Sequence, residues 1–187
     1  MSGKPVIGVV GLGTMGLGIA QLYAQAGFDV VATDAIAAVR DSARARMAEA
    51  LNARVSSGKL SPEARDATLT RLHVVTGPAG MGKANIVIEA IIEQLEAKQT
   101  LFAELESAVA GDAVLATNTS SLSVATIMAR LKHPERGLGL HFFNPVPAMK
   151  LVELVAHAGT NASSVAMARQ VTEEAGKTVI ACADRPG

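Results

Sequence analysis

A glycine-rich turn near the N-terminus constrains the fold of this chain more than any other feature. The apolar run Val6–Val10 leads directly into the sequence Gly11-Leu12-Gly13-Thr14-Met15-Gly16. The segment Leu17–Ala26 then has the composition of a helix, and a second apolar run ends at Asp34. A strand, a GxGxxG turn, a helix and a second strand ending in an acid are the parts of a dinucleotide-binding βαβ unit.

Each glycine of the motif has its own physical task in such a unit. Gly11 permits the tight turn, Gly13 leaves room for a pyrophosphate, and Gly16 lets the helix press on the strand. The amides at the helix N-terminus then face the phosphate charge. Asp34 is placed to accept hydrogen bonds from the adenosine ribose, and its carboxylate repels a 2′-phosphate, which favours NAD over NADP. Arg40 is the one nearby cation that would weaken this preference. The alternative is that the glycines only form a turn and that Asp34 only caps a helix.

The rest of the chain alternates short apolar runs with longer segments of helical spacing, as in a doubly wound α/β sheet. Eight strands are expected, most of them bounded by Gly, Pro, Asn or Asp: Val6–Val10, Asp29–Asp34, His73–Thr76, Ile86–Ala90, Ala113–Thr117, Gly137–His141, Lys150–Val155 and Thr178–Ala183. We therefore predict a Rossmann-type sheet of about eight mostly parallel strands. No internal linker divides the chain, so residues 1–187 are expected to form one domain.

The segment between the second and third strands is too long for a simple crossover. One apolar stripe recurs there every four residues: Val39, Ala43, Met47, Leu51 and Val55. This spacing predicts a long helix. Gly58 can end it, and Ser61-Pro62-Glu63 provides an N-cap, a first-turn proline and a first-turn acid for a second helix through Leu72. A helical hairpin is thus expected after the second strand. Two later helices are expected, one over residues 95–109 and one from an Asn161 cap to a Gly176 stop.

Composition favours a small-molecule partner. Lys plus Arg and Asp plus Glu number 17 each, so no charge bias suggests nucleic acid. No apolar run reaches the roughly 18 residues of a membrane span. The single cysteine, Cys182, cannot form an internal disulfide, and Met1–Pro5 leads into a strand instead of a signal peptide. A cytoplasmic protein is therefore expected, and no metal site is predicted.

Polar residues follow two of the predicted strands at the point where each strand ends. Ala113–Thr117 leads into Asn118-Thr119-Ser120-Ser121, and Gly137–Leu140 leads into His141-Phe142-Phe143-Asn144-Pro145. In a doubly wound sheet, ligands bind at the carboxyl ends of the strands. These two segments are therefore the first candidates for a reactive site.

Glu153 is the one acid in the apolar strand Lys150–Val155, and because an unpaired buried carboxylate is costly, it is expected to have a partner. His141 is the candidate, since a carboxylate on a neighbouring strand can orient an imidazole and make it more basic. Such a pair suits oxidation of an alcohol: the imidazole removes the hydroxyl proton as hydride leaves for a nicotinamide, and the carboxylate stabilises the imidazolium. Alternatives remain open. A backbone carbonyl could satisfy His141, Lys150 could pair with Glu153, and residues 118–121 could be a helix cap.

Asn118–Leu122, His141–Pro147 and Met149–Glu153 together resemble the L-3-hydroxyacyl-CoA dehydrogenase family, and so does Val87–Glu93. With the glycine motif at one end and Asp184–Gly187 at the other, the resemblance covers essentially the whole chain. It implies the family's N-terminal NAD-binding domain, similar to that of 3-hydroxybutyryl-CoA dehydrogenases, with six parallel strands and two antiparallel additions. The family uses NAD to oxidise the (S)-3-hydroxyl of an acyl-CoA to a 3-ketone, in fatty-acid β-oxidation or related pathways.

The resemblance also implies roles for individual residues. His141 resembles the family's catalytic base, and Glu153 its partner. Ser120 resembles a serine that contacts both the substrate oxygen and the cofactor, and Asn144 resembles a contact to cofactor and substrate. Two further residues match cofactor positions on the nicotinamide side and the ribose side: Glu93 and Lys98.

The helical hairpin is where the resemblance leads us to expect the CoA tail. Residues 35–59 carry an excess of positive charge: Arg40, Arg44, Arg46, Arg54 and Lys59 against Asp41 and Glu49. This excess suits CoA phosphates. A solvated helix face explains the same charges equally well.

The resemblance further implies that Pro186-Gly187 leads into an all-helical C-terminal domain, absent from these 187 residues. That domain is expected to supply an active-site asparagine and most of a homodimer interface. Alone, these residues are expected to bind NAD, to turn over acyl-CoA poorly and not to form that dimer. A β-hydroxyacid dehydrogenase is an alternative, since such enzymes share the glycine motif but generally rely on a catalytic lysine. The pair of His141 with Glu153 and the run His141–Asn144 argue against it. A non-catalytic or crystallin-like NAD-binding relative is disfavoured because His141 and Glu153 are both present.

Overall fold

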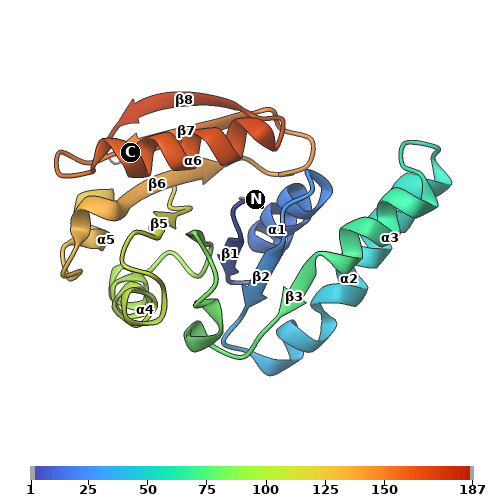
Figure 1. Ribbon diagram of the computed structural model, residues 1–187, viewed down its shortest axis with the longest axis horizontal. Coiled ribbons are helices and arrows are strands. Elements are labelled where there is room, and N and C mark those ends of the chain that lie inside the picture. Colours follow the sequence, from blue (N-terminus) through green and yellow to red (C-terminus); the bar gives the residue numbers. More distant parts are fainter. Residues whose placement is uncertain (1–2, 186–187) are drawn as a thin grey trace.

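A single sheet of eight strands organises the computed structural model, which describes residues 3–185. Residues 1–2 and 186–187 lie outside the described residues. They include the start of the segment Met1–Pro5 and the end of the motif Asp184–Gly187. The strand order is β3-β2-β1-β4-β5-β6-β7-β8. Figure 1 shows this sheet with helices packed along it. The predicted doubly wound α/β class is confirmed.

The strands begin and end within two residues of the predicted bounds. They are β1 (Ile7–Val10), β2 (Val30–Thr33), β3 (Leu72–Val74), β4 (Ile86–Glu89), β5 (Val114–Thr117), β6 (Gly137–Phe142), β7 (Leu151–Ala156) and β8 (Thr178–Ala183). All pairs from β3 to β6 are parallel, β7 is antiparallel to β6, and β8 is parallel to β7. Six parallel strands and two reversed ones result, as the family resemblance implies.

Helices cover both faces of the sheet and enclose two apolar cores. They are α1 (Thr14–Gln25), α2 (Ala37–Ser56), α3 (Pro62–Thr70), α4 (Leu95–Ala108), α5 (Val124–Met128) and α6 (Ala162–Glu174), with 3₁₀ turns η1 (Pro78–Met81) and η2 (Pro134–Arg136). Strand residues pack against α1, α2 and α6 in one core, and against α4 and α5 in the other. Each large side chain that is fully buried contributes about 1.5–3 kcal/mol, so these cores hold the sheet rigidly beneath its carboxyl-end loops.

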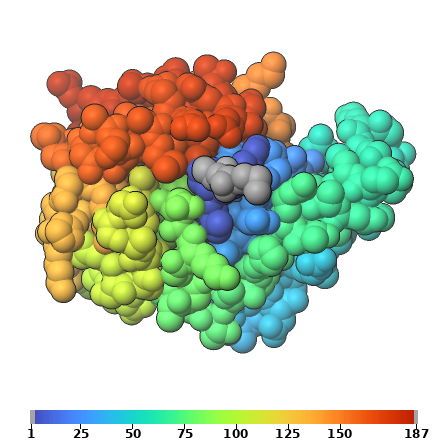
Figure 2. All heavy atoms as spheres, viewed as in Figure 1, coloured from blue at the N-terminus to red at the C-terminus, as the bar shows by residue number. Residues whose placement is uncertain are grey.

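The predicted hairpin is present as α2 and α3, and it projects from the body of the molecule (Figures 1 and 2). The middle of the predicted stripe, Ala43, Met47 and Leu51, is fully buried. Gly58 has φ +70° after α2, a conformation that glycine adopts without strain. Ser61 caps α3 by accepting a hydrogen bond from the amide of Ala64 at 3.2 Å.

Two local predictions were wrong, and one short helix was not predicted. α1 begins at Thr14 and not at Leu17, because the last residues of the glycine motif already form its first turn. Leu72 begins β3 instead of ending the hairpin, since its backbone pairs with Val30. The five-residue helix α5 was not predicted, because five residues are too few to show helical periodicity.

Within residues 3–185, no helix has both the length and the apolar content needed to cross a bilayer. The cytoplasmic location stays a prediction.

Candidate active site

The glycine turn after β1 combines two glycines that the fold itself requires with one that it does not. Gly11 has φ +91°, and a Cβ there would lie 2.6 Å from the carbonyl oxygen of Ala90. A Cβ on Gly16 would lie 1.7 Å from the carbonyl oxygen of Gly11, so the helix presses directly on the turn. Gly13 is the N-cap of α1, and a Cβ there would meet nothing within 4 Å. The structure therefore leaves open space at the N-terminus of α1.

Asp34, at the end of β2, binds the same turn. One carboxylate oxygen accepts from the amide of Leu12 at 2.7 Å, and the other accepts from the amide of Ile36 at 2.9 Å. A cavity of about 460 Å³ lies beside Asp34, between the end of β2 and α4. Arg40 donates to the carbonyl oxygens of Asp34 and Ala35, which hold its guanidinium on the backbone. The open helix N-terminus, the carboxylate and the adjacent cavity fit a bound dinucleotide.

His141 and Glu153 face each other across the antiparallel pair β6–β7, where they are register partners. Nδ1 of His141 lies 2.8 Å from Oε2 of Glu153. The predicted contact is therefore present. Glu153 is not buried as the apolar strand suggested, because its side chain is 32% exposed against 20% for His141. Both side chains therefore reach solvent, and the carboxylate orients the imidazole through Nδ1.

The other ring nitrogen of His141, Nε2, lies 3.1 Å from the hydroxyl oxygen of Ser120. An ionised carboxylate only accepts hydrogen bonds, so a charged Glu153 fixes the proton of a neutral imidazole on Nδ1. Nε2 is then the acceptor, which is the form a general base requires. Asn118 holds the ends of β5 and β6 together, because its side-chain oxygen accepts from the amide of Phe142 at 2.8 Å.

Asn144 follows β6 in an exposed loop. Among residues 3–185, the structure gives its side chain no hydrogen-bond partner. Its amide is therefore accessible to a ligand, as its predicted role requires.

Glu93 holds the loop that carries Ser120. Its Oε1 accepts from the hydroxyl of Thr119, from the amides of Ser120 and Ser121 at 2.9 and 3.1 Å, and from the hydroxyl of Ser121. Burial raises the pKa of the Glu93 carboxyl, but the hydrogen bond from Thr119 and the charge of Lys98 outweigh it and lower the pKa to about 2. Glu93 is therefore ionised at neutral pH.

Lys98 is fully buried beneath Glu93, on the first turn of α4. Its ammonium lies 2.6 Å from Oε1 of Glu89 and 3.2 Å from Oε2 of Glu93. Glu89 is fully buried too, and its other oxygen accepts from the hydroxyl of Thr117 at 2.7 Å. Sequence reasoning missed Glu89, although the argument used for Glu153 applies to it equally: it is an acid in the apolar run Ile86–Ala90.

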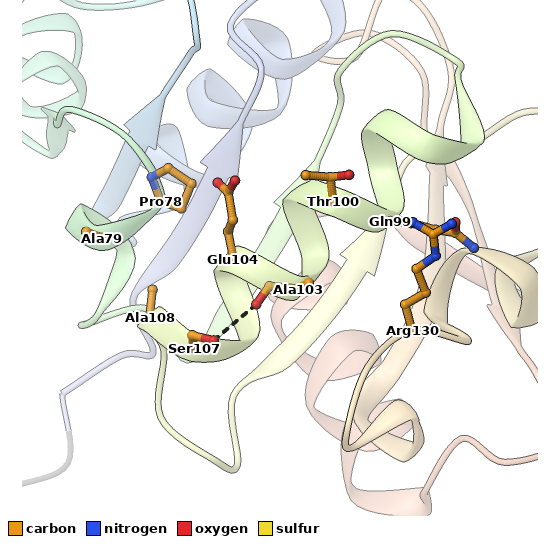
Figure 3. Close-up of a pocket in the computed structure, with 9 residues that line it drawn as sticks. All are labelled: Pro78, Ala79, Gln99, Thr100, Ala103, Glu104, Ser107, Ala108 and Arg130. Atoms are coloured by element: carbon orange, nitrogen blue, oxygen red, sulfur yellow. Dashed lines mark hydrogen bonds between the residues drawn. The ribbon is translucent and has the colours of Figure 1, made fainter.

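A small cavity of about 250 Å³ lies beside the His141–Glu153 pair. The loop after β5 and the strands β6, β7 and β8 line it, and Ser120 and Cys182 are among the lining residues. A larger hollow of about 830 Å³ lies between η1, α4 and the segment after α5. Figure 3 shows that its walls are mainly short side chains, with Glu104 and Arg130 apart from one another. None of the predicted site residues lines this larger hollow, so we place the chemistry at the smaller cavity.

Much of the hairpin's positive charge is tied to the backbone. Arg44 donates to the carbonyl oxygen of Leu69, and Arg46 donates to that of Leu12 in the glycine turn. Together with Arg40, three of the five cations expected to face CoA phosphates therefore hold carbonyl oxygens within the chain.

The chain is similar to known proteins over nearly its whole length. Residues 6–185 match the family model described as 3-hydroxyacyl-CoA dehydrogenase, NAD binding domain. The chain is 43% identical to a 3-hydroxyadipyl-CoA dehydrogenase of Escherichia coli over 97% of this chain and 38% of that protein. It is 41% identical to a 3-hydroxybutyryl-CoA dehydrogenase of Mycobacterium tuberculosis over 97% of this chain and 64% of that protein.

A solved structure shares the same architecture. The (S)-3-hydroxybutyryl-CoA dehydrogenase from Ralstonia eutropha superposes with a TM-score of 0.95 at 33% identity, covering 99% of this chain and 65% of that one. The chain thus spans between 38% and 65% of the length of these relatives.

Proposed function

Because the chain belongs to the 3-hydroxyacyl-CoA dehydrogenase family, as that family's NAD-binding domain, we propose that it carries out NAD-dependent oxidation of an (S)-3-hydroxyacyl-CoA to the 3-oxoacyl-CoA. One observation carries the proposal: His141 contacts Glu153 through one ring nitrogen and Ser120 through the other. This arrangement stands at the carboxyl ends of β5 and β6, the edge of the sheet that also holds the glycine turn.

In the proposed reaction, Nε2 of His141 takes the proton of the 3-hydroxyl group. Ser120 holds the substrate oxygen beside that nitrogen, and Glu153 stabilises the imidazolium that forms. When bound, NAD supplies the hydride acceptor. A correctly placed general base contributes about 10²–10⁴-fold to the rate, so the pair accounts for a substantial part of catalysis.

Two features of the site support NAD as the cofactor. Asp34 stands where the adenosine ribose is expected, and its carboxylate repels a 2′-phosphate. Arg40, the cation that would offset this repulsion, is held by the carbonyl oxygens of Asp34 and Ala35. Asn144 and Glu93 remain proposed cofactor contacts. Lys98 reaches a ligand only if its contacts to Glu89 and Glu93 rearrange, because it has no exposed surface here.

The part of the relatives that this chain does not span is proposed to complete the substrate site and to form a homodimer. Their names connect the family to 3-hydroxybutyryl and 3-hydroxyadipyl thioesters of CoA, which supports an acyl-CoA as the substrate class. In residues 3–185, the cavity beside His141 measures only about 250 Å³. That volume is below the roughly 300 Å³ at which small-molecule pockets begin, so further walls are needed to enclose an acyl chain.

The proposal is tested by NADH formation from (S)- and (R)-3-hydroxybutyryl-CoA, with the complete protein and with residues 1–187 alone. We expect the complete protein to oxidise the (S) substrate and not its enantiomer. We expect the shorter chain to bind NAD but to turn over slowly. Full activity of the shorter chain would refute the proposed need for a further segment, and oxidation of neither enantiomer by the complete protein would refute the function.

Gly13→Ala separates the cofactor role of the turn from its structural role. A Cβ at Gly13 meets nothing within 4 Å, so we expect a change in stability of no more than about 1 kcal/mol. The same methyl group occupies the space proposed for the pyrophosphate, so NAD affinity is expected to fall at least about tenfold. Thermal unfolding and calorimetric titration measure the two effects. Gly111→Ala, also in open space, is the control. Unchanged NAD affinity in Gly13→Ala would place the cofactor elsewhere.

A further inference from the structure

Thr119 has no assigned role, yet it joins the loop that carries Ser120 to a buried network of charges. Its side chain is nearly buried, and its hydroxyl donates to Oε1 of Glu93 while accepting from the amide of Leu122 at 3.0 Å. One hydroxyl therefore ties the loop both to Glu93 and to itself. Ser120, the next residue, is exposed and reaches His141.

The support beneath Glu93 is rigid. Lys98 and Glu89 are both fully buried, and their side chains lie 2.6 Å apart. Glu89 also accepts from the amide of Ile91 and from the hydroxyl of Thr117, so its carboxylate is fixed from three sides. Side chains held by several charge-assisted hydrogen bonds within packed secondary structure have little freedom to move.

We propose that Thr119 is a positioning residue, through which Glu93 and the buried Lys98–Glu89 pair hold the loop 119–122 so that the Ser120 hydroxyl stays on Nε2 of His141. The contacts run from Glu89 to Lys98 and on to Glu93. Glu93 then holds the loop through the hydroxyl of Thr119 and, beside it, through the amides of Ser120 and Ser121. The inference rests on the proposed function for its catalytic consequence. The geometric part, that Thr119 controls the Ser120–His141 contact, does not.

The positioning role proposed for Thr119 and Glu93 can be told apart from a role in binding the cofactor. Oε1 of Glu93 is occupied by donors from the loop, which leaves Oε2 as the oxygen that faces Lys98. A residue that only binds NAD alters NAD affinity when it is replaced. A residue that positions Ser120 alters the environment of the His141 ring and the rate of the chemical step, because small misplacements of reacting groups slow catalysis strongly.

The first test follows the ring nitrogens of His141 by NMR, assigned among the four histidines with His141→Gln. Thr119→Val keeps the shape of the side chain but removes its hydroxyl. We expect it to move the Nε2 signal towards its position in Ser120→Ala, and Thr119→Ser to restore the wild-type position. Thr178→Val, at an exposed position on β8, is the matched control. A wild-type signal in folded Thr119→Val, or an equal shift in Thr178→Val, would overturn the proposal.

Glu93→Met removes the acceptor at the other end of the same hydrogen bond, and it decides the question if Thr119→Val does not fold. The ring signal is again expected to move towards that of Ser120→Ala. An unmoved signal in folded Glu93→Met would overturn the proposal. This readout needs no turnover, so it stands or fails independently of the proposed function.

The second test is a double-mutant cycle on kcat in the complete protein. Thr119→Val is expected to lower kcat about ten- to hundredfold in the wild-type background. In the Ser120→Ala background the same change is expected to lower kcat by less than about twofold, because Thr119 acts through Ser120. In each background, Thr119→Val is expected to change NAD affinity little relative to the same protein without that substitution. Equal losses in the two backgrounds, or a loss confined to NAD affinity, would contradict the positioning role.

Discussion

Replacing His141 by glutamine is expected to lower kcat by roughly two to four decades while leaving NAD affinity nearly unchanged. Glutamine keeps a polar side chain of similar reach, but it cannot take up a proton at Nε2 and carry the charge that Glu153 stabilises. His141 lies on β6, and the glycine turn and Asp34 follow β1 and β2, which are three and four strands away in the sheet. The adenosine half of the cofactor is thus outside the reach of the substitution. Single-turnover NADH formation and calorimetric NAD titration measure the two quantities.

His133→Gln is the matched control. His133 is exposed and contacts Glu135, in the connection that leads to β6. The variant His133→Gln is expected to keep the wild-type kcat. A loss in His141→Gln that is shared equally between kcat and NAD affinity would show that the histidine supports the fold or the cofactor and not the proton transfer.

Lys98→Met is expected to lower the free energy of unfolding by about 3–5 kcal/mol. The ammonium of Lys98 is fully buried and lies 2.6 Å from the fully buried carboxylate of Glu89. Methionine fills much of the same volume, but it leaves that carboxylate without a compensating charge. Denaturant unfolding measures the loss. The expected loss in free energy of unfolding is large, because most single substitutions cost only about 0.5–3 kcal/mol.

Two variants make this result specific to the buried pair. Lys83→Met removes an exposed lysine and is expected to change stability by no more than about 0.5 kcal/mol. The double variant Glu89→Gln with Lys98→Met is expected to recover part of the loss, since the amide needs no counter-charge. A cost of less than about 0.5 kcal/mol for Lys98→Met would show that water or another group compensates the carboxylate.

The sheet was predictable because its strands are short apolar runs that end at glycine or polar residues. The helical hairpin was predictable for a related reason: Ala43, Met47 and Leu51 recur at the spacing of one helix face, and all three are buried. Gly58, Ser61 and Asn161 then mark helix ends through local geometry alone. These signals lie within a few residues of the structure that they specify, so one sequence is enough to read them.

Features that depend on distant contacts could not be predicted. The short helix α5 is capped by Ser123 and by Asp184, which accepts from the amides of Val124 and Ala125 some sixty residues away. Leu72 fits a helix or a strand equally well, and only its pairing with Val30 decides the matter.

The candidate site also has a part that the sequence predicts and a part that it does not. Contact between His141 and Glu153 was predicted, because a histidine stands near the end of the strand that precedes the strand of Glu153. The burial argument for that contact was wrong, since the Glu153 side chain is 32% exposed. The network of Glu89, Lys98, Glu93 and Thr119 was not, because it is assembled from the ends of β4 and β5 and the start of α4. Its donors and acceptors are common residue types whose spacing carries no distinctive pattern.

The most direct test of the central claim follows the hydrogen on C3 of the substrate. The complete protein is mixed with NAD and (S)-3-hydroxybutyryl-CoA that carries deuterium at C3. The products are then separated, and their masses are measured by mass spectrometry. Hydride transfer from C3 to the cofactor predicts that the deuterium is recovered on the nicotinamide ring. Deuterium that stays in the acyl product or appears in the solvent would contradict this chemistry.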